Sequence, residues 1–185
     1  MTSDHHSSVI ADLHRVKGRA ELIGGRMVSL PPTGHRPSEI AAEIYVSLRN
    51  YARVTGNGRA YTDTLGYAVP ELTSGRESFS PEASYYDGPP PADEMDFVPG
   101  PPTFAAEVRS KSDYGPAAER DMADKRADYF EAGTKVVWDV DTLEGLIRSY
   151  SADAPDRPVV FIAGQTADAE PAVPGWSIAV DDVFA

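Results

Sequence analysis

The stretch Thr103-Phe-Ala-Ala-Glu-Val-Arg-Ser110 decides how the rest of this chain is organised. Its run of apolar residues predicts a buried β-strand, and Glu107 stands in the middle of that strand. Transferring an isolated carboxylate from water into an apolar interior is strongly unfavourable, so such a group changes its protonation or finds a cationic partner. We therefore expect Glu107 to have a function.

Length and composition favour one ordinary globular domain. The chain has 185 residues, of which 41% are hydrophobic and 25% charged, and no apolar run approaches the roughly 20 residues that a membrane span needs. We expect a flexible or partly helical segment over residues 1–18, followed by a single domain over residues 19–185. The N-terminus lacks the pattern of a secretory signal, so we expect a cytoplasmic location without membrane association. His5 and His6 have no third ligand nearby, which favours a frayed terminus over a metal site.

Cysteine content and net charge exclude several function classes. With no cysteine, the chain has no disulfide framework, thiolate metal site or cysteine nucleophile, so any metal must be held by oxygen atoms or histidine. The formal net charge of −12 argues against broad, sequence-independent binding of nucleic acid, although a local basic groove is compatible with it. Acidic residues around a divalent cation would add to this charge without repelling a substrate once the metal is bound.

The segments before the central strand alternate between strand and helix patterns. Residues 20–30 predict a hairpin that turns at Gly24-Gly25, and residues 39–53 predict a helix that is capped by Ser38 and stopped by Gly56. Residues 59–69 predict a strand pair or one bent strand, and residues 79–86 a short strand with Pro81 and Glu82 at its start. The proline-rich residues 87–102 predict an exposed connection that could serve as a lid.

The segments after the central strand predict a parallel crossover. A helix over residues 117–132, ending at Gly133, leads into an apolar strand over residues 135–140. On that helix Lys125 lies beside Met122 and Tyr129, on the flank of the face that meets the sheet. Residues 146–151 and 158–163 predict antiparallel strands, and residues 173–180 a final short strand. The fold class is therefore α/β with a mixed central sheet.

Three charged residues form the strongest candidate site. Glu82 and Glu107 come from neighbouring predicted strands, and Lys125 points inward from the helix that follows. Two converging carboxylates suit Mg²⁺ or Mn²⁺, which prefer oxygen ligands and retain water for chemistry. A nearby ammonium group can orient the attacking water or stabilise the transition state of phosphoryl transfer.

An ordered series of motifs resembles the Uma2 family (DUF820), and the resemblance covers nearly the whole chain. The hairpin at residues 21–28 and the stretch at residues 174–180 also match segments of that family. The central motifs are Pro81-Glu82, Glu107-Val-Arg-Ser110-Lys-Ser-Asp113, the residues from Asp121 to Lys125, Tyr129-Phe-Glu-Ala-Gly133 and Val137-Trp-Asp-Val-Asp141.

The resemblance implies a restriction-endonuclease-like fold of the PD-(D/E)XK nuclease superfamily, in which helices flank a mixed sheet. It also implies hydrolysis of phosphodiester bonds with Mg²⁺ or Mn²⁺, with nucleic acid as the substrate and DNA favoured. A homodimer is plausible because small nucleases that cut both strands usually pair, although the sequence shows no interface. Carried over by motif, Glu82 and Glu107 are the metal ligands and, with Lys125, the catalytic residues. Two departures stand out: Glu82 replaces an aspartate, and Arg109 occupies the lysine position of the strand motif.

Simpler interpretations compete with each assignment. Glu107 could form a purely structural ion pair with Lys125 or Arg109, Glu82 could be an exposed edge residue, and Lys125 a solvated helix lysine. Asp139 and Asp141 are expected to end a strand and cap a turn. Accessory candidates that could reach the site or its rim are Arg109, Lys111, His35, Glu43 and Glu21. The alternative function is a catalytically weak or inactive nuclease-fold module for binding or regulation, which the acidity of the chain and the altered first acid favour.

Overall fold

The structure is a computed structural model that describes residues 10–185. The expectations for residues 1–9, including His5 and His6, lie outside the described residues. Residues 10–13 are helical, and the division into a lead-in and one domain stays a prediction. Within residues 10–185, no helix is long and apolar enough to span a bilayer.

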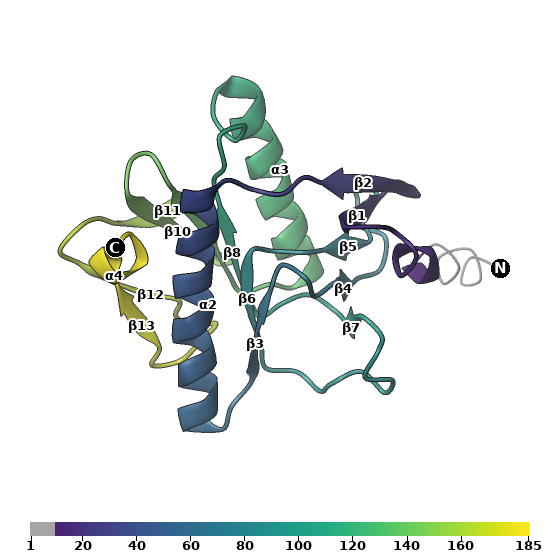
Figure 1. The fold of residues 1–185 in the computed structure, drawn as a ribbon, viewed down its shortest axis with the longest axis horizontal. Coiled ribbons are helices and arrows are strands. Elements are labelled where there is room, and N and C mark those ends of the chain that lie inside the picture. The colour runs from purple at the N-terminus through teal and green to yellow at the C-terminus, as the bar shows by residue number, and fades with distance from the viewer. Residues whose placement is uncertain (1–9) are drawn as a thin grey trace.

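A six-stranded mixed sheet forms the centre of the molecule (Figure 1). Its strands, in spatial order, are β11 (Ala154–Phe161), β10 (Leu146–Ser151), β9 (Val136–Asp141), β8 (Phe104–Val108), β6 (Ala83–Tyr86) and β3 (Arg59–Thr62). Strands β8 and β9 are parallel and are connected through helix α3 (Pro116–Ala132), whereas the other neighbours in this sheet pair antiparallel. The predicted α/β class with a mixed central sheet is confirmed.

Two helices cover opposite faces of this sheet (Figure 1). On helix α2 (His35–Thr55) the fully buried Ile40, Ile44 and Leu48 recur every four residues and pack in one core with Phe104 and Trp138. The second core lies on the other face and contains Tyr129 of α3 together with residues 105 and 137 of the sheet. Because strand side chains alternate between faces, Glu107 points to the face that α3 covers.

The N-terminal hairpin consists of β1 (Arg19–Ile23) and β2 (Arg26–Leu30), as predicted. Gly24 and Gly25 have φ angles of 56° and 68°, the left-handed region that this tight turn requires. Strand β1 docks on the segment around β5 (Ser78–Phe79), because the N–H of Leu22 donates to Ser78 Oγ at 2.7 Å. The hairpin therefore lies beside β5, close to the α3 face (Figure 1).

Two elements before the central strand differ from the prediction. Helix α2 begins at His35 after Gly34, so Ser38 lies inside the helix and does not cap it. Pro37 is tolerated there because the first-turn N–H groups of a helix have no intrahelical partner. The expected strand at residues 79–86 is interrupted at Pro81, which cannot donate to a ladder, and Glu82 therefore precedes β6.

The smaller elements surround this framework. Residues 59–69 divide between β3 and β4 (Tyr67–Ala68), which joins β5 and β7 (Val98–Pro99) in a three-stranded sheet, so the proline-rich connection contains a strand. Near the C-terminus β13 (Ser177–Ala179) pairs with β12 (Thr166–Asp168), a strand that the sequence analysis did not identify, and leads into α4 (Val180–Val183).

Candidate active site

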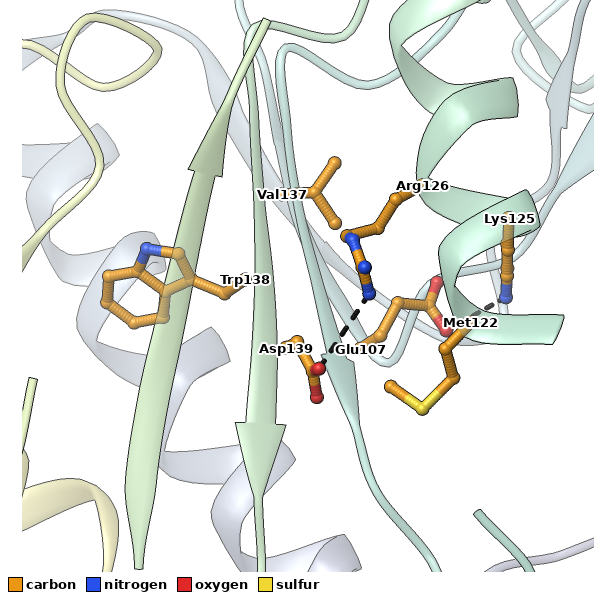
Figure 2. Close-up of a pocket in the computed structure, with 7 residues that line it drawn as sticks. All are labelled: Glu107, Met122, Lys125, Arg126, Val137, Trp138 and Asp139. Carbon is orange, nitrogen blue, oxygen red and sulfur yellow. Dashed lines mark hydrogen bonds and ion pairs between the residues drawn. The ribbon is translucent and has the colours of Figure 1, made fainter. Parts of the chain in front are cut away.

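The three residues of the predicted site come together on the α3 face of the sheet. Lys125 Nζ lies 2.8 Å from Glu107 Oε2, and Figure 2 shows the lysine reaching from α3 toward the strand. Glu82 Oε2 accepts a hydrogen bond of 3.3 Å from the backbone N–H of Val108, the residue that follows Glu107. Segments far apart in the sequence thus place two carboxylates and one ammonium group at the same point.

A fourth charged residue, Glu21 of β1, completes this cluster. Its side chain is almost fully buried, with Oε1 3.2 Å from Lys125 Nζ and 3.0 Å from the backbone N of Ser80, which donates to it. An ion pair with Arg76 holds its other oxygen. The sequence analysis placed Glu21 at the rim, although a carboxylate between Ala20 and Leu22 in a predicted strand carries the same signal as Glu107.

The cationic form of Lys125 is strongly favoured. Burial alone would lower its pKa, but the negative charges of Glu107, Glu21 and Glu82 outweigh that effect and raise the pKa above its usual range. Lys125 is therefore an ammonium group at neutral pH. It can donate hydrogen bonds and stabilise negative charge, but it cannot accept a proton as a general base.

Tyr129 fixes the second oxygen of Glu107. Its hydroxyl donates to Glu107 Oε1 at 2.6 Å, and its buried ring stacks on Phe79 with centroids 4.1 Å apart. Burial and the adjacent Glu107 charge raise the Tyr129 pKa well above its usual value, so the phenol remains a donor. Each carboxylate oxygen of Glu107 thus accepts a hydrogen bond, and the two bonds fix the orientation of the carboxylate.

Glu82 has an unusual protonation equilibrium. Burial, followed by the negative charge of Glu107, raises the pKa of the Glu82 carboxyl to about 8, although Lys125 and Arg19 act in the opposite direction. The two carboxylates are therefore close enough to repel each other. A cation that contacts both would relieve this repulsion.

The donor set of Glu82 and Glu107 fits a small hard cation. Mg²⁺ and Mn²⁺ sites use one or two carboxylates and complete their coordination with water and substrate oxygens. Within residues 10–185, no three histidine or acidic side chains gather into a closed metal cage. Beside Glu107 a pocket of about 20 Å³, lined also by Met122, Lys125, Arg126 and Asp139, has room for about one water molecule (Figure 2).

Comparison with known proteins identifies the family. Residues 10–181 match the family model of Uma2, which is described as "Putative restriction endonuclease". The chain belongs to the Uma2 family. The crystal structure of a putative nuclease belonging to DUF820 from Anabaena variabilis is similar, with a TM-score of 0.72 and 17% sequence identity over 95% of this chain and 96% of that chain. At this identity the likeness shows a shared fold, and no curated protein matches the chain.

Arg109, which stands at the expected lysine position of the strand motif, pairs with acidic residues other than Glu107. Its guanidinium binds Asp139 through two hydrogen bonds of 2.7 Å and also contacts Glu119. The expectation that Asp139 ends a strand and caps a turn is wrong, because its side chain is buried in β9 against this arginine. Asp141 does cap the turn, since its Oδ1 accepts from the backbone N–H groups of residues 143 and 144.

The remaining accessory candidates lie away from the cluster of charged residues around Glu107. Lys111 is exposed in the loop after β8. His35 and Glu43 are exposed on α2, which covers the opposite face of the sheet, and His35 pairs with Glu39 at 3.4 Å. The structure therefore does not bring Lys111, His35 or Glu43 to Glu107.

Proposed function

We propose that this Uma2 protein is a metal-dependent nuclease that hydrolyses phosphodiester bonds in nucleic acid, with DNA as the favoured substrate. The observation that carries the proposal is the 2.8 Å contact between Lys125 and Glu107, made beside Glu82. Three chain segments converge there on the charge pattern that phosphoryl transfer requires.

Glu82 and Glu107 are the residues that would hold Mg²⁺ or Mn²⁺. When bound, the cation would lower the pKa of a water molecule and stabilise charge on a phosphate oxygen. Glu82 must lose its proton to serve as a ligand, since its pKa of about 8 leaves it largely protonated at neutral pH in the metal-free protein.

Lys125 would stabilise the negative charge that develops on the phosphate oxygens. An ammonium group has three N–H donors. Two of the Lys125 donors are directed to carboxylates of the described residues, Glu107 and Glu21, and the third is available for an oxygen of the substrate. Glu21 and Tyr129 would act on this step indirectly, because they hold Lys125 and Glu107 in position.

A second candidate is the catalytically weak binding or regulatory module. Arg19 lies 3.4 Å from Glu82, and Lys125 pairs with Glu107, so both carboxyl groups have a cationic side chain beside them without a metal. A nuclease-fold protein that had lost metal binding would retain such pairs. If the protein does cut duplex DNA, a homodimer is the expected assembly, because each site attacks one strand.

Cleavage of supercoiled plasmid DNA tests the two functions. With Mg²⁺ or Mn²⁺ we expect the protein to produce nicked plasmid, and Glu107→Gln to lower the rate by about 10²–10⁴-fold. Glu43→Gln is the matched control, since it makes the same change at an exposed position on the opposite face and should retain the full rate. Absence of metal-dependent cleavage by the folded wild-type protein would favour the binding module.

A further inference from the structure

Each proposed metal ligand is paired with a cation of the protein, and each of these cations also contacts a second carboxylate. Lys125 bridges Glu107 and Glu21 at 2.8 Å and 3.2 Å. On the other side Arg19 bridges Glu82 and Asp63, at 3.4 Å and 3.0 Å. The second carboxylate would keep each cation in place when the first is taken by a metal.

The contacts of the Arg19 guanidinium differ in length. Its Nη2 donates to the backbone oxygen of Ser80 at 2.8 Å and its Nη1 pairs with Asp63 at 3.0 Å, so the 3.4 Å contact with Glu82 is the longest. Its Nε is buried and has no hydrogen-bond partner within residues 10–185. Arg19 would therefore keep two good contacts after losing Glu82.

We propose that Arg19 is a positioning residue that occupies Glu82 as an internal counter-ion and competes with the divalent cation for it. This inference rests on the proposed function, because it takes Glu82 as a metal ligand. Asp63 and the Ser80 carbonyl retain Arg19 when the cation binds. Strand β1 thus sets the metal affinity of a site whose ligands lie elsewhere in the chain.

Electrostatic repulsion determines whether Arg19 raises or lowers the affinity of the site for a metal. A guanidinium beside Glu82 reduces the attraction of that carboxylate for a second cation, because like charges a few ångströms apart repel strongly in a partly buried site. Arginine stays protonated at every physiological pH, so it competes with the metal whenever Glu82 has lost its proton. Once Glu82 is ionised, removing the Arg19 charge should tighten metal binding. Removing the Asp63 charge should weaken it, because Glu82 would then be the remaining carboxylate partner of Arg19.

Calorimetric titration with Mn²⁺ at a pH above the Glu82 pKa of about 8, where this carboxyl group is ionised, measures the competition. We expect Arg19→Gln to lower the Kd for Mn²⁺ by about tenfold and Asp63→Asn to raise it. Arg15 and Asp12 form an exposed ion pair with each other, so Arg15→Gln and Asp12→Asn make the same charge changes away from the site. These controls should leave the Kd within about twofold of the wild-type value.

Arg19→Lys separates charge from packing. It retains the positive charge, so its Kd should remain within about threefold of wild type. Melting curves without metal confirm that each variant is folded. The inference is overturned if Arg19→Gln binds Mn²⁺ no more tightly than Arg15→Gln does, or if Arg19→Lys tightens binding as much as Arg19→Gln.

The same titrations distinguish failure of this inference from failure of the proposed function. If wild type binds Mn²⁺, Glu107→Gln does not, and Arg19→Gln resembles Arg15→Gln, only the role of Arg19 is refuted. If the folded wild-type protein does not bind Mn²⁺ at all, both the metal-dependent function and the role of Arg19 are refuted.

Discussion

Glu107 on β8 and Asp139 on β9 are partners in the parallel ladder and face the same helix, yet their surroundings differ. Asp139 is bound by the guanidinium of Arg109 through two hydrogen bonds, and 2% of its side chain is exposed. Glu107 is bound by Lys125 and Tyr129, and 17% of its side chain is exposed. One sheet face therefore carries a closed ion pair directly beside an accessible one.

The difference shows what separates a structural carboxylate from a candidate ligand. A bidentate arginine uses both oxygens of Asp139 in a planar arrangement that leaves little room for a competing cation. Lysine is a point charge that contacts a single oxygen of Glu107, and its second carboxylate, Glu21, can retain it if that contact opens. Glu107 can exchange partners, whereas Asp139 contributes to the stability of the fold.

Breaking the Arg109–Asp139 pair should have the largest effect on stability. We expect Asp139→Ala to lower the free energy of unfolding by about 3–5 kcal/mol, because a buried guanidinium loses its main partner. Urea unfolding measures the change. Glu119→Ala is the matched control, since Glu119 contacts the same arginine with 51% of its side chain exposed and should lower the free energy by less than about 1 kcal/mol.

Equal effects of these two variants would contradict the distinction between the clusters. They would mean that Asp139 is no more important to Arg109 than a partner at the surface. The pKa of Arg109, which Asp139 raises above its usual range by hydrogen bonding, is consistent with the larger role of Asp139.

The second prediction concerns the pH dependence of Glu82. Burial and Glu107 raise its pKa from 4.5 to about 8, against the opposing charges of Lys125 and Arg19. Between these values the unfolded chain releases the proton while the folded protein retains it, so Glu82 contributes stability below pH 4.5 that is lost as the pH rises to 8.

Glu82→Gln removes this titration. The variant should gain stability relative to metal-free wild type as the pH rises from 5 to 8, by on the order of 2 kcal/mol at the upper end, since partial exposure of the side chain moderates the effect. Chemical unfolding at several pH values measures the difference. A constant difference across that range would show that Glu82 is already ionised without metal.

Local patterns in the sequence were enough to predict the strand of Glu107 and the helix of Lys125. Helical periodicity places Lys125 on the inner flank of α3, and the apolar run around Glu107 places that residue in the sheet. The contact of Glu21 with Lys125 depends on how the hairpin docks beside β5, a long-range arrangement that no local pattern encodes. For the same reason the sequence did not show that Arg109 pairs with Asp139.

Pro81 shows a second limit of predicting structure from the sequence. Its effect on a strand was recognised, but periodicity alone could not show whether the strand started at Pro81 or was interrupted there. The interruption places Glu82 before β6, where its carboxylate can accept from the N–H of Val108 on β8.

The smallest expected loss of stability comes from removing the hydroxyl of a buried tyrosine, and two tyrosines allow a comparison. Tyr129→Phe removes the hydrogen bond to the Glu107 carboxylate but keeps the stacking on Phe79, whereas Tyr67→Phe removes a bond of 2.9 Å to the neutral hydroxyl of Ser84. Bonds to charged groups contribute more than neutral ones, so urea unfolding should show losses of about 1.5–2 kcal/mol for Tyr129→Phe and about 0.5–1 kcal/mol for Tyr67→Phe. If Tyr129→Phe lost no more than Tyr67→Phe, the hydrogen bond to Glu107 would contribute no more than a bond between neutral groups. Lys125 would then be the main partner that holds Glu107, whereas Arg109 holds both oxygens of Asp139, and the contrast between the two carboxylates would rest on their ion pairs alone.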